Sequence, residues 1–135
     1  MLSYPRESVT VFFLDPGADE KLPIFVAPSD HSITIEKVTF VITATIAASV
    51  TKFVDLSCEN GGTAGTATVN MGGTAGGTLG WTDMVPQSLV PADGSGRLLA
   101  GEVLIVDYAE TGAVAPTGIS VTVEYVHGLG SSRNS

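Results

Sequence analysis

The clearest alternation of hydrophobic and polar positions lies near the end of the chain, in residues 101–126. Apolar and polar residues alternate strictly from Ile119 to Tyr125, which predicts an antiparallel strand with one buried face. Residues 103–108 are apolar on both parities until Asp107, which favours a place inside a sheet or against a second surface. A loop with glycines and a proline, at 110–118, joins these two strands within one sandwich.

Further strands are predicted upstream. Residues 8–14 are rich in β-branched and aromatic side chains, and a turn follows them. Residues 22–27 contain Pro23 and are followed by Pro28, which predicts an edge or bent strand because proline lacks a ladder donor. Shorter strand patterns occur at 51–58, 66–71 and 97–99.

Residues 32–44 contain a change of face. Apolar residues occupy odd positions up to Ile35 and even positions from Val38 onward. One strand cannot change face without an inserted residue, so we expect a β-bulge, or a crossing between sheets, at Glu36 and Lys37.

Seven or eight short strands without a helical pattern predict an all-β fold. The bent early strands and long crossings, with no Cys-Trp-Cys spacing, favour a jelly roll over an immunoglobulin sandwich. We therefore expect a single-domain antiparallel β-sandwich of jelly-roll type at 8–127, a flexible N-terminal arm at 1–7 and a flexible C-terminal tail at 128–135. Glycine-rich loops are expected within 61–80, where GGTAG occurs twice, and an irregular excursion at 81–96.

The composition and net charge limit the kinds of partner that the chain is expected to bind. Hydrophobic residues make up 44% of the 135 residues and charged residues 15%, which predicts some apolar surface that meets a partner. The net charge is −8 and the six Lys and Arg residues are scattered, so we expect no nucleic-acid binding. No apolar run reaches the roughly 20 residues of a membrane span, and no signal-peptide pattern begins the chain. A protein without membrane contact, made in the cytoplasm, is expected.

Few residues of the sequence are candidates for catalysis or metal binding. His31 and His127 are expected to be exposed loop histidines, because a jelly-roll metal site would show closely spaced histidines such as His-x-His. Asp107 and Glu110 could act as an acid–base pair on a glycoside only if they converge, and loop carboxylates on an acidic surface are the default. Cys58 is expected to be a small buried apolar residue. No P-loop and no G-x-S-x-G is present. We predict no enzyme, no metal and no cofactor.

Three residues are candidate interface anchors. Leu2 and Tyr4 lie in the predicted arm, and Trp81 is the only tryptophan. Large amphipathic side chains contribute most per residue at interfaces. The alternative for Trp81 is that its ring covers one end of the core.

A family resemblance rests on four segments: TVFFLDPGAD at 10–19, LPIFVAP at 22–28, a Thr/Ala/Gly-rich middle, and LLAGEVLIVDYAETGAVAPTGISVTVEY at 98–125. Together they resemble small structural proteins of tailed bacteriophages, in particular head cement or decoration proteins built on a jelly roll. The resemblance implies a homotrimer on the outer capsid surface of the virion that clamps neighbouring major capsid protein subunits. It also implies synthesis in the host bacterial cytoplasm and no catalytic residues.

Two other function classes remain open at this point. A carbohydrate-binding or receptor-binding jelly-roll module of a phage fibre or tail would present exposed aromatic platforms, and the chain has one Trp and three Tyr. A metal-independent enzyme would need a carboxylate pair in a deep cleft.

Overall fold

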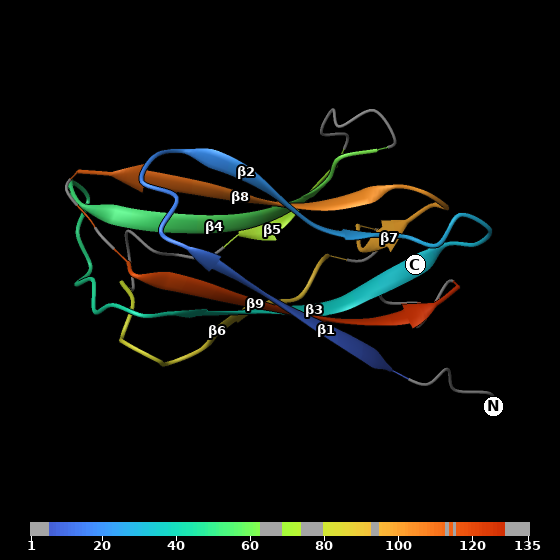
Figure 1. Cartoon of the computed structure of the whole chain (residues 1–135), viewed down its shortest axis with the longest axis horizontal. Helices are drawn as coiled ribbons and strands as arrows, with labels where there is room; N and C mark the ends of the chain where they lie inside the picture. The colour runs from blue at the N-terminus through green and yellow to red at the C-terminus, as the bar shows by residue number, and fades with distance from the viewer. Residues whose placement is uncertain are drawn as a thin grey trace.

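The computed structural model describes residues 6–62, 69–73, 80–92, 95–112, 114 and 116–128. These residues form two antiparallel sheets that pack face to face (Figure 1). Among them, no helix is long and apolar enough to cross a membrane. The strands are β1 (Glu7–Leu14), β2 (Glu20–Val26), β3 (Ile33–Ile42), β4 (Phe53–Asn60), β5 (Val69–Gly73), β6 (Gln87–Leu89), β7 (Arg97–Leu98), β8 (Val103–Thr111) and β9 (Gly118–His127).

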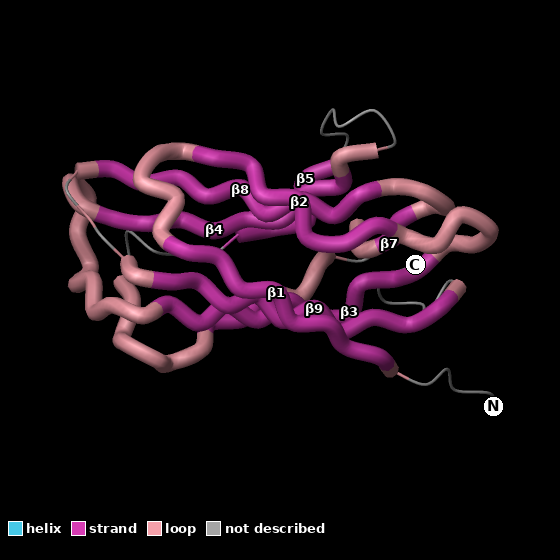
Figure 2. The backbone as a smooth tube through the Cα atoms, viewed as in Figure 1, coloured by secondary structure: helices cyan, strands magenta, loops and turns pink. Residues whose placement is uncertain are grey.

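The order of strands is that of a jelly roll. One sheet runs β1-β9-β3-β6, with β7 also paired to β3, and the other runs β2-β8-β4-β5. Since β6 and β7 pair with different parts of β3, they share one strand position. With β6 and β7 counted as one strand, the first strand pairs with the last and the second with the second last, and this order continues inward to the pair β4-β5. The chain is thus arranged as a long hairpin that folds over into two layers (Figure 2). The predicted jelly-roll sandwich is confirmed.

The two strands at the end of the chain organise the layers. β9 lies between β1 and β3 in one sheet, and β8 lies between β2 and β4 in the other. Leu104, Ile105 and Val106 are consecutive in β8 and are all buried, so both faces of this strand are covered. The predicted interior position is confirmed, and the loop after β8 crosses from one layer to the other.

Strands β3 and β2 both show the irregularity that the sequence predicts. The register of β3 against β9 shifts between Ile35 and Lys37, which is the predicted β-bulge. Because of this shift, the core-facing apolar residues on both sides of the bulge are fully buried: Ile33, Ile35, Val38, Phe40 and Ile42. Pro23 lies in β2, an edge strand whose register against β8 shifts between Pro23 and Phe25, so the proline removes no internal ladder bond.

Two expectations need correction. The segment 81–96 is not wholly irregular, because Gln87–Leu89 pairs with β3 as β6. The strand expected at 66–71 is found at Val69–Gly73, where it pairs with β4. The GGTAG repeats lie largely outside the described residues. The arm at 1–7 and the tail at 128–135 lie mostly outside them as well and remain predictions.

Cys58 is fully buried, as expected, and takes no part in a disulfide. Burial, with a smaller contribution from Glu59, raises the pKa of its thiol to about 12. Burial also raises the pKa of Tyr108, whose hydroxyl donates to Glu110 over 2.8 Å. The folded chain therefore holds both protons more tightly than the unfolded chain does.

This difference predicts a loss of stability in alkaline solution. The stability linked to the Cys58 proton is fully present below the ordinary thiol pKa of about 8.5. It is lost as the pH rises toward the folded value of about 12, by up to about 1.4 kcal/mol per pH unit. Urea unfolding between pH about 8 and about 10.5 should show this decline. Cys58→Ala should show a shallower one, and an equal decline in both proteins would contradict the assignment.

Candidate interaction surface

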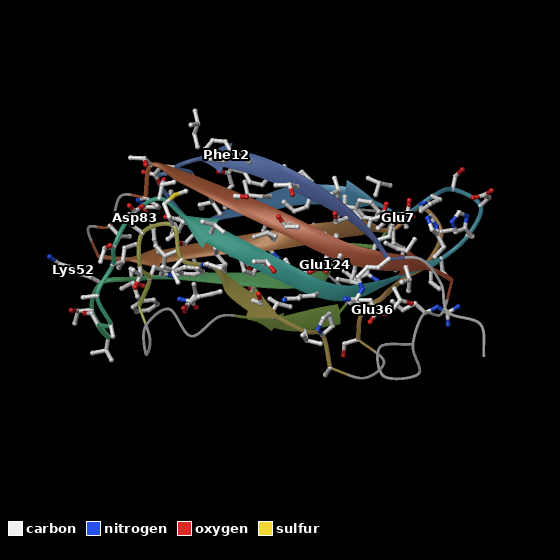
Figure 3. The ribbon with its side chains drawn as sticks, turned by 90° about the horizontal axis from the view of Figure 1, so that it is seen from below. Glu7, Phe12, Glu36, Lys52, Asp83 and Glu124 are labelled. Carbon is white, nitrogen blue, oxygen red and sulfur yellow. The ribbon has the colours of Figure 1, made fainter. Side chains whose placement is uncertain are left out.

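Large exposed apolar side chains gather at one end of the sandwich. Among the residues that the structure describes, eight such side chains are exposed, of which Val26, Val90 and Leu99 lie elsewhere. The other five come from the end of β1, the β3–β4 loop and the loop before β6. We call this set the apolar end; its members are Phe12, Leu14, Val50, Met84 and Val85. Figure 3 shows Phe12, Lys52 and Asp83 at this end and Glu7 toward the other.

β1 contributes two members because it is an apolar run on an edge strand. Phe13 faces the core, whereas Phe12 and Leu14 point to the outer face and are 60% and 74% exposed. The ring of Phe12 lies over the backbone of β9, so that a Cβ on Gly118 would sit 2.4 Å from its Cζ. Phe12 is thus held in place by the sheet while most of its surface faces solvent.

Met84 is displayed by a strained turn. Its φ of +63° is in the left-handed region, which costs a side chain larger than glycine about 1 kcal/mol. The turn is held because the Met84 N–H donates to the carbonyl of Ile42 at the end of β3, and the Asp83 N–H donates to the Thr45 hydroxyl. The side chain is 64% exposed and so recovers little of this cost by packing. Strain that persists on a surface is typical of functional segments.

Trp81 supports this loop from inside. Its side chain is 2% exposed and its indole N–H donates to the carbonyl of Val54 over 2.9 Å. Its backbone makes two hydrogen bonds with Ile46, of 2.7 and 2.8 Å. The ring therefore covers the end of the core, which is the alternative stated for it, and presents almost no surface to a partner. Leu2 and Tyr4 lie outside the described residues.

A shallow depression of about 300 Å³ lies beside the apolar end. Apart from backbone, its polar groups are hydroxyls and the amine of Lys52. None of the described residues that line it carries a carboxylate or an imidazole. Its lining residues are Ala44, Thr45, Ile46, Ala47, Ser49, Lys52 and Val114.

The two carboxylates considered for catalysis do not converge. Asp107 and Glu110 are three positions apart in β8, so they point to opposite faces of the sheet. Asp107 lies opposite Lys21 of β2, and Glu110 accepts a hydrogen bond from Tyr108. Both belong to a strand and not to a loop, and this pair cannot act on one glycosidic bond.

The opposite end of the sandwich holds a cluster that sequence reasoning missed. Nε2 of His31 and Nδ1 of His127 are 2.7 Å apart. Nδ1 of His31 lies 2.6 Å from Oδ1 of Asp30, and Nε2 of His127 contacts Oε2 of Glu7. His31 is exposed, as expected, whereas His127 is the last residue of β9 and only partly exposed, so the expected loop position is wrong for His127. The two side chains contact each other. Among the described residues, no group of three or more His, Cys, Asp or Glu could hold a metal ion.

Comparisons with known proteins give only weak likenesses. No protein-family model and no curated protein matches the chain. A structure of the Gx strain of infectious bursal disease virus is 14% identical over 93% of this chain and 33% of that one, with a TM-score of 0.41. The VP2 subviral particle of that virus is 15% identical over 93% and 34%, with a TM-score of 0.42.

A Bacillus endospore appendage that forms disulfide-linked pili is 13% identical over 92% of this chain and 88% of that one, with a TM-score of 0.39. This chain therefore spans about a third of the virus chains and most of the appendage subunit. At these TM-scores the likenesses do not say what the chain does.

Proposed function

We propose that the chain is a structural virion protein that works by contact with other protein subunits. In specific terms, it is a cement or decoration protein that binds the outside of a phage head as a homotrimer and clamps neighbouring major capsid protein subunits. The apolar end is the observation that carries the proposal. The sequence resemblance to phage head proteins and the jelly-roll order of the strands agree with it.

The grouping of the five exposed apolar side chains favours a partner that covers them. Single exposed apolar residues are ordinary on protein surfaces. Five at one end, drawn from three separate segments, indicate a surface that a partner covers. Fully burying each large side chain contributes about 1.5 to 3 kcal/mol. A few such residues therefore suffice for a specific contact.

Symmetry and a repeating shell would strengthen that contact. A closed trimer buries apolar surface that the monomer exposes. A trimer that contacts several capsid subunits at once gains affinity because its later contacts form at high effective concentration. Modest individual interfaces are then enough for stable binding to the head.

The sugar-binding alternative is less favoured. Such sites need exposed aromatic platforms with polar partners, but Trp81 and Tyr108 are buried. Tyr125 is covered in part by Phe25, with ring centroids 4.8 Å apart. Of the aromatic side chains that the structure describes, only Phe12 is among the large exposed apolar residues, and it lacks a polar group.

The first test is the mass of the purified chain by light scattering at neutral pH. We expect three times the chain mass of 13.8 kDa, and co-sedimentation with purified phage heads that lack the protein. An unrelated acidic protein of similar size is the control for trapping in the pellet. A monomer at high concentration that stays in the supernatant would contradict the proposal.

A further inference from the structure

We propose that His31 and His127 bind one divalent transition-metal ion between their rings. The inner nitrogens, Nε2 of His31 and Nδ1 of His127, face each other at 2.7 Å. At this distance the two rings share one hydrogen in an N–H···N hydrogen bond, and a metal ion bound to both nitrogens would take the place of that hydrogen. The ring centroids are 4.9 Å apart and the ring planes meet at 47°.

The outer nitrogens are already arranged as in metal sites. Nδ1 of His31 is hydrogen-bonded to Asp30 over 2.6 Å, and Nε2 of His127 is hydrogen-bonded to Glu7. An ionised carboxylate only accepts, so each outer nitrogen donates its N–H, and once the hydrogen shared by the inner nitrogens is lost both of these present lone pairs. Metal-binding histidines in proteins commonly donate their second N–H to a carboxylate in this way, which fixes the tautomer and the ring orientation.

The space between the rings needs only a small adjustment. Tetrahedral zinc with Zn–N distances of about 2.0 to 2.1 Å places two nitrogens about 3.3 Å apart. The inner nitrogens of His31 and His127 would have to separate by about 0.6 Å from their present distance. The side chains are 41% and 42% exposed, so rotation about their own bonds can provide this movement.

The backbone beneath the pair is fixed. His127 lies opposite Ile33 in the β3–β9 ladder, next to the loop that carries His31. The Gly128 N–H donates to the carbonyl of Ser32, and the buried hydroxyl of Thr34 donates to the carbonyl of Gly128, both over 2.8 Å. The two histidines are thus held together by bonds that do not depend on their own side chains.

The donor atoms select the kind of ion. Imidazole nitrogens suit Zn²⁺, Ni²⁺ and Cu²⁺, whereas Mg²⁺ and Ca²⁺ prefer oxygen ligands. The chain supplies two nitrogens, and water completes the coordination. Through Glu7 and Asp30 the ion would join the start of β1 to the loop before β3 and the end of β9. This site lies at the end of the sandwich opposite the apolar end, so it stands independently of the proposed function.

Titration calorimetry of the full chain with ZnCl₂ tests the site. We expect one saturable ion per chain and a rise in melting temperature with zinc, because a ligand that binds only the folded state stabilises it. His31→Ala and His127→Ala should each lower the affinity by at least about tenfold. Glu7→Gln keeps both ligands and should lower the affinity by about tenfold, the lower end of what loss of such a carboxylate partner costs, and MgCl₂ should not compete.

Controls distinguish zinc binding at this site from zinc binding elsewhere on the acidic surface, and from loss of binding through misfolding. Asp83→Asn, at the apolar end, should bind zinc as the wild type does. Circular dichroism without metal checks that each variant folds. In a second measurement, spectra of the Cu²⁺-loaded chain should show two imidazole nitrogens. Absence of saturable zinc binding, unchanged zinc binding in both histidine variants, or equal competition by Mg²⁺ would overturn the proposal.

Discussion

Replacing Trp81 with alanine is expected to lower the free energy of unfolding by at least about 4 kcal/mol. Deleting a buried tryptophan costs about 3 to 5 kcal/mol because the core around it does not fully collapse. The substitution also leaves the carbonyl of Val54 without the indole N–H, which adds about 1 to 3 kcal/mol. A domain of this size is stable by only about 5 to 15 kcal/mol, so much of its stability would be lost.

The measurement is urea or thermal unfolding followed by circular dichroism, since the variant lacks the only tryptophan. Trp81→Phe should cost less, because a smaller aromatic ring still fills much of the site, although the hydrogen bond is lost and a small cavity remains. Val50→Ala is the matched control: this side chain is 87% exposed and its loss should change stability by less than about 0.5 kcal/mol. A Trp81→Ala variant as stable as the wild type would instead favour the interface role for Trp81.

Local features of the fold could be predicted from the sequence because they follow from side-chain parity. The change of face between Ile35 and Val38 required an extra residue, and the register shifts there. Pro23 could not donate inside a sheet, and its strand is an edge. The alternation before Tyr125 predicted β9 because one face of that strand is buried.

Other features depend on tertiary pairing and carry little local signal. β6 has only three residues and lies between Pro86 and Pro91, so its own sequence does not predict a strand. It is a strand because it pairs with β3. His31 and His127 are far apart in sequence and meet because β3 and β9 pair next to them. The detectable signal was that both histidines lie next to predicted strand ends.

The sequence predicts part of the apolar end. Four consecutive apolar residues end β1, and a strand with one buried face can bury only alternate ones, so Phe12 and Leu14 had to be exposed or covered by a partner. The edge position of β1, with one face on the core, is set by its pairing with β9 and not by its own residues. The left-handed backbone of Met84 had no sequence signal, because methionine is not a residue that favours it.

The double variant Phe12→Ser, Leu14→Ser is expected to abolish association while leaving the monomer folded. Two anchors that each contribute about 1.5 to 3 kcal/mol when buried correspond to a loss of about a hundredfold or more in affinity. Because both side chains are mostly exposed in the monomer, its melting temperature should fall by only a few degrees. Light scattering measures the mass, and co-sedimentation with phage heads measures capsid binding.

The matched control is Val26→Ser, Leu99→Ser, which removes two apolar side chains that are 62% and 52% exposed at the opposite end. It should leave both the mass and head binding unchanged. Loss of the trimer mass in the first variant would place the subunit contact at the apolar end. Loss of head binding with the mass unchanged would place the capsid contact there. If both double variants behave alike, the apolar end is not the surface that a partner covers, and the proposed function loses the observation that carries it.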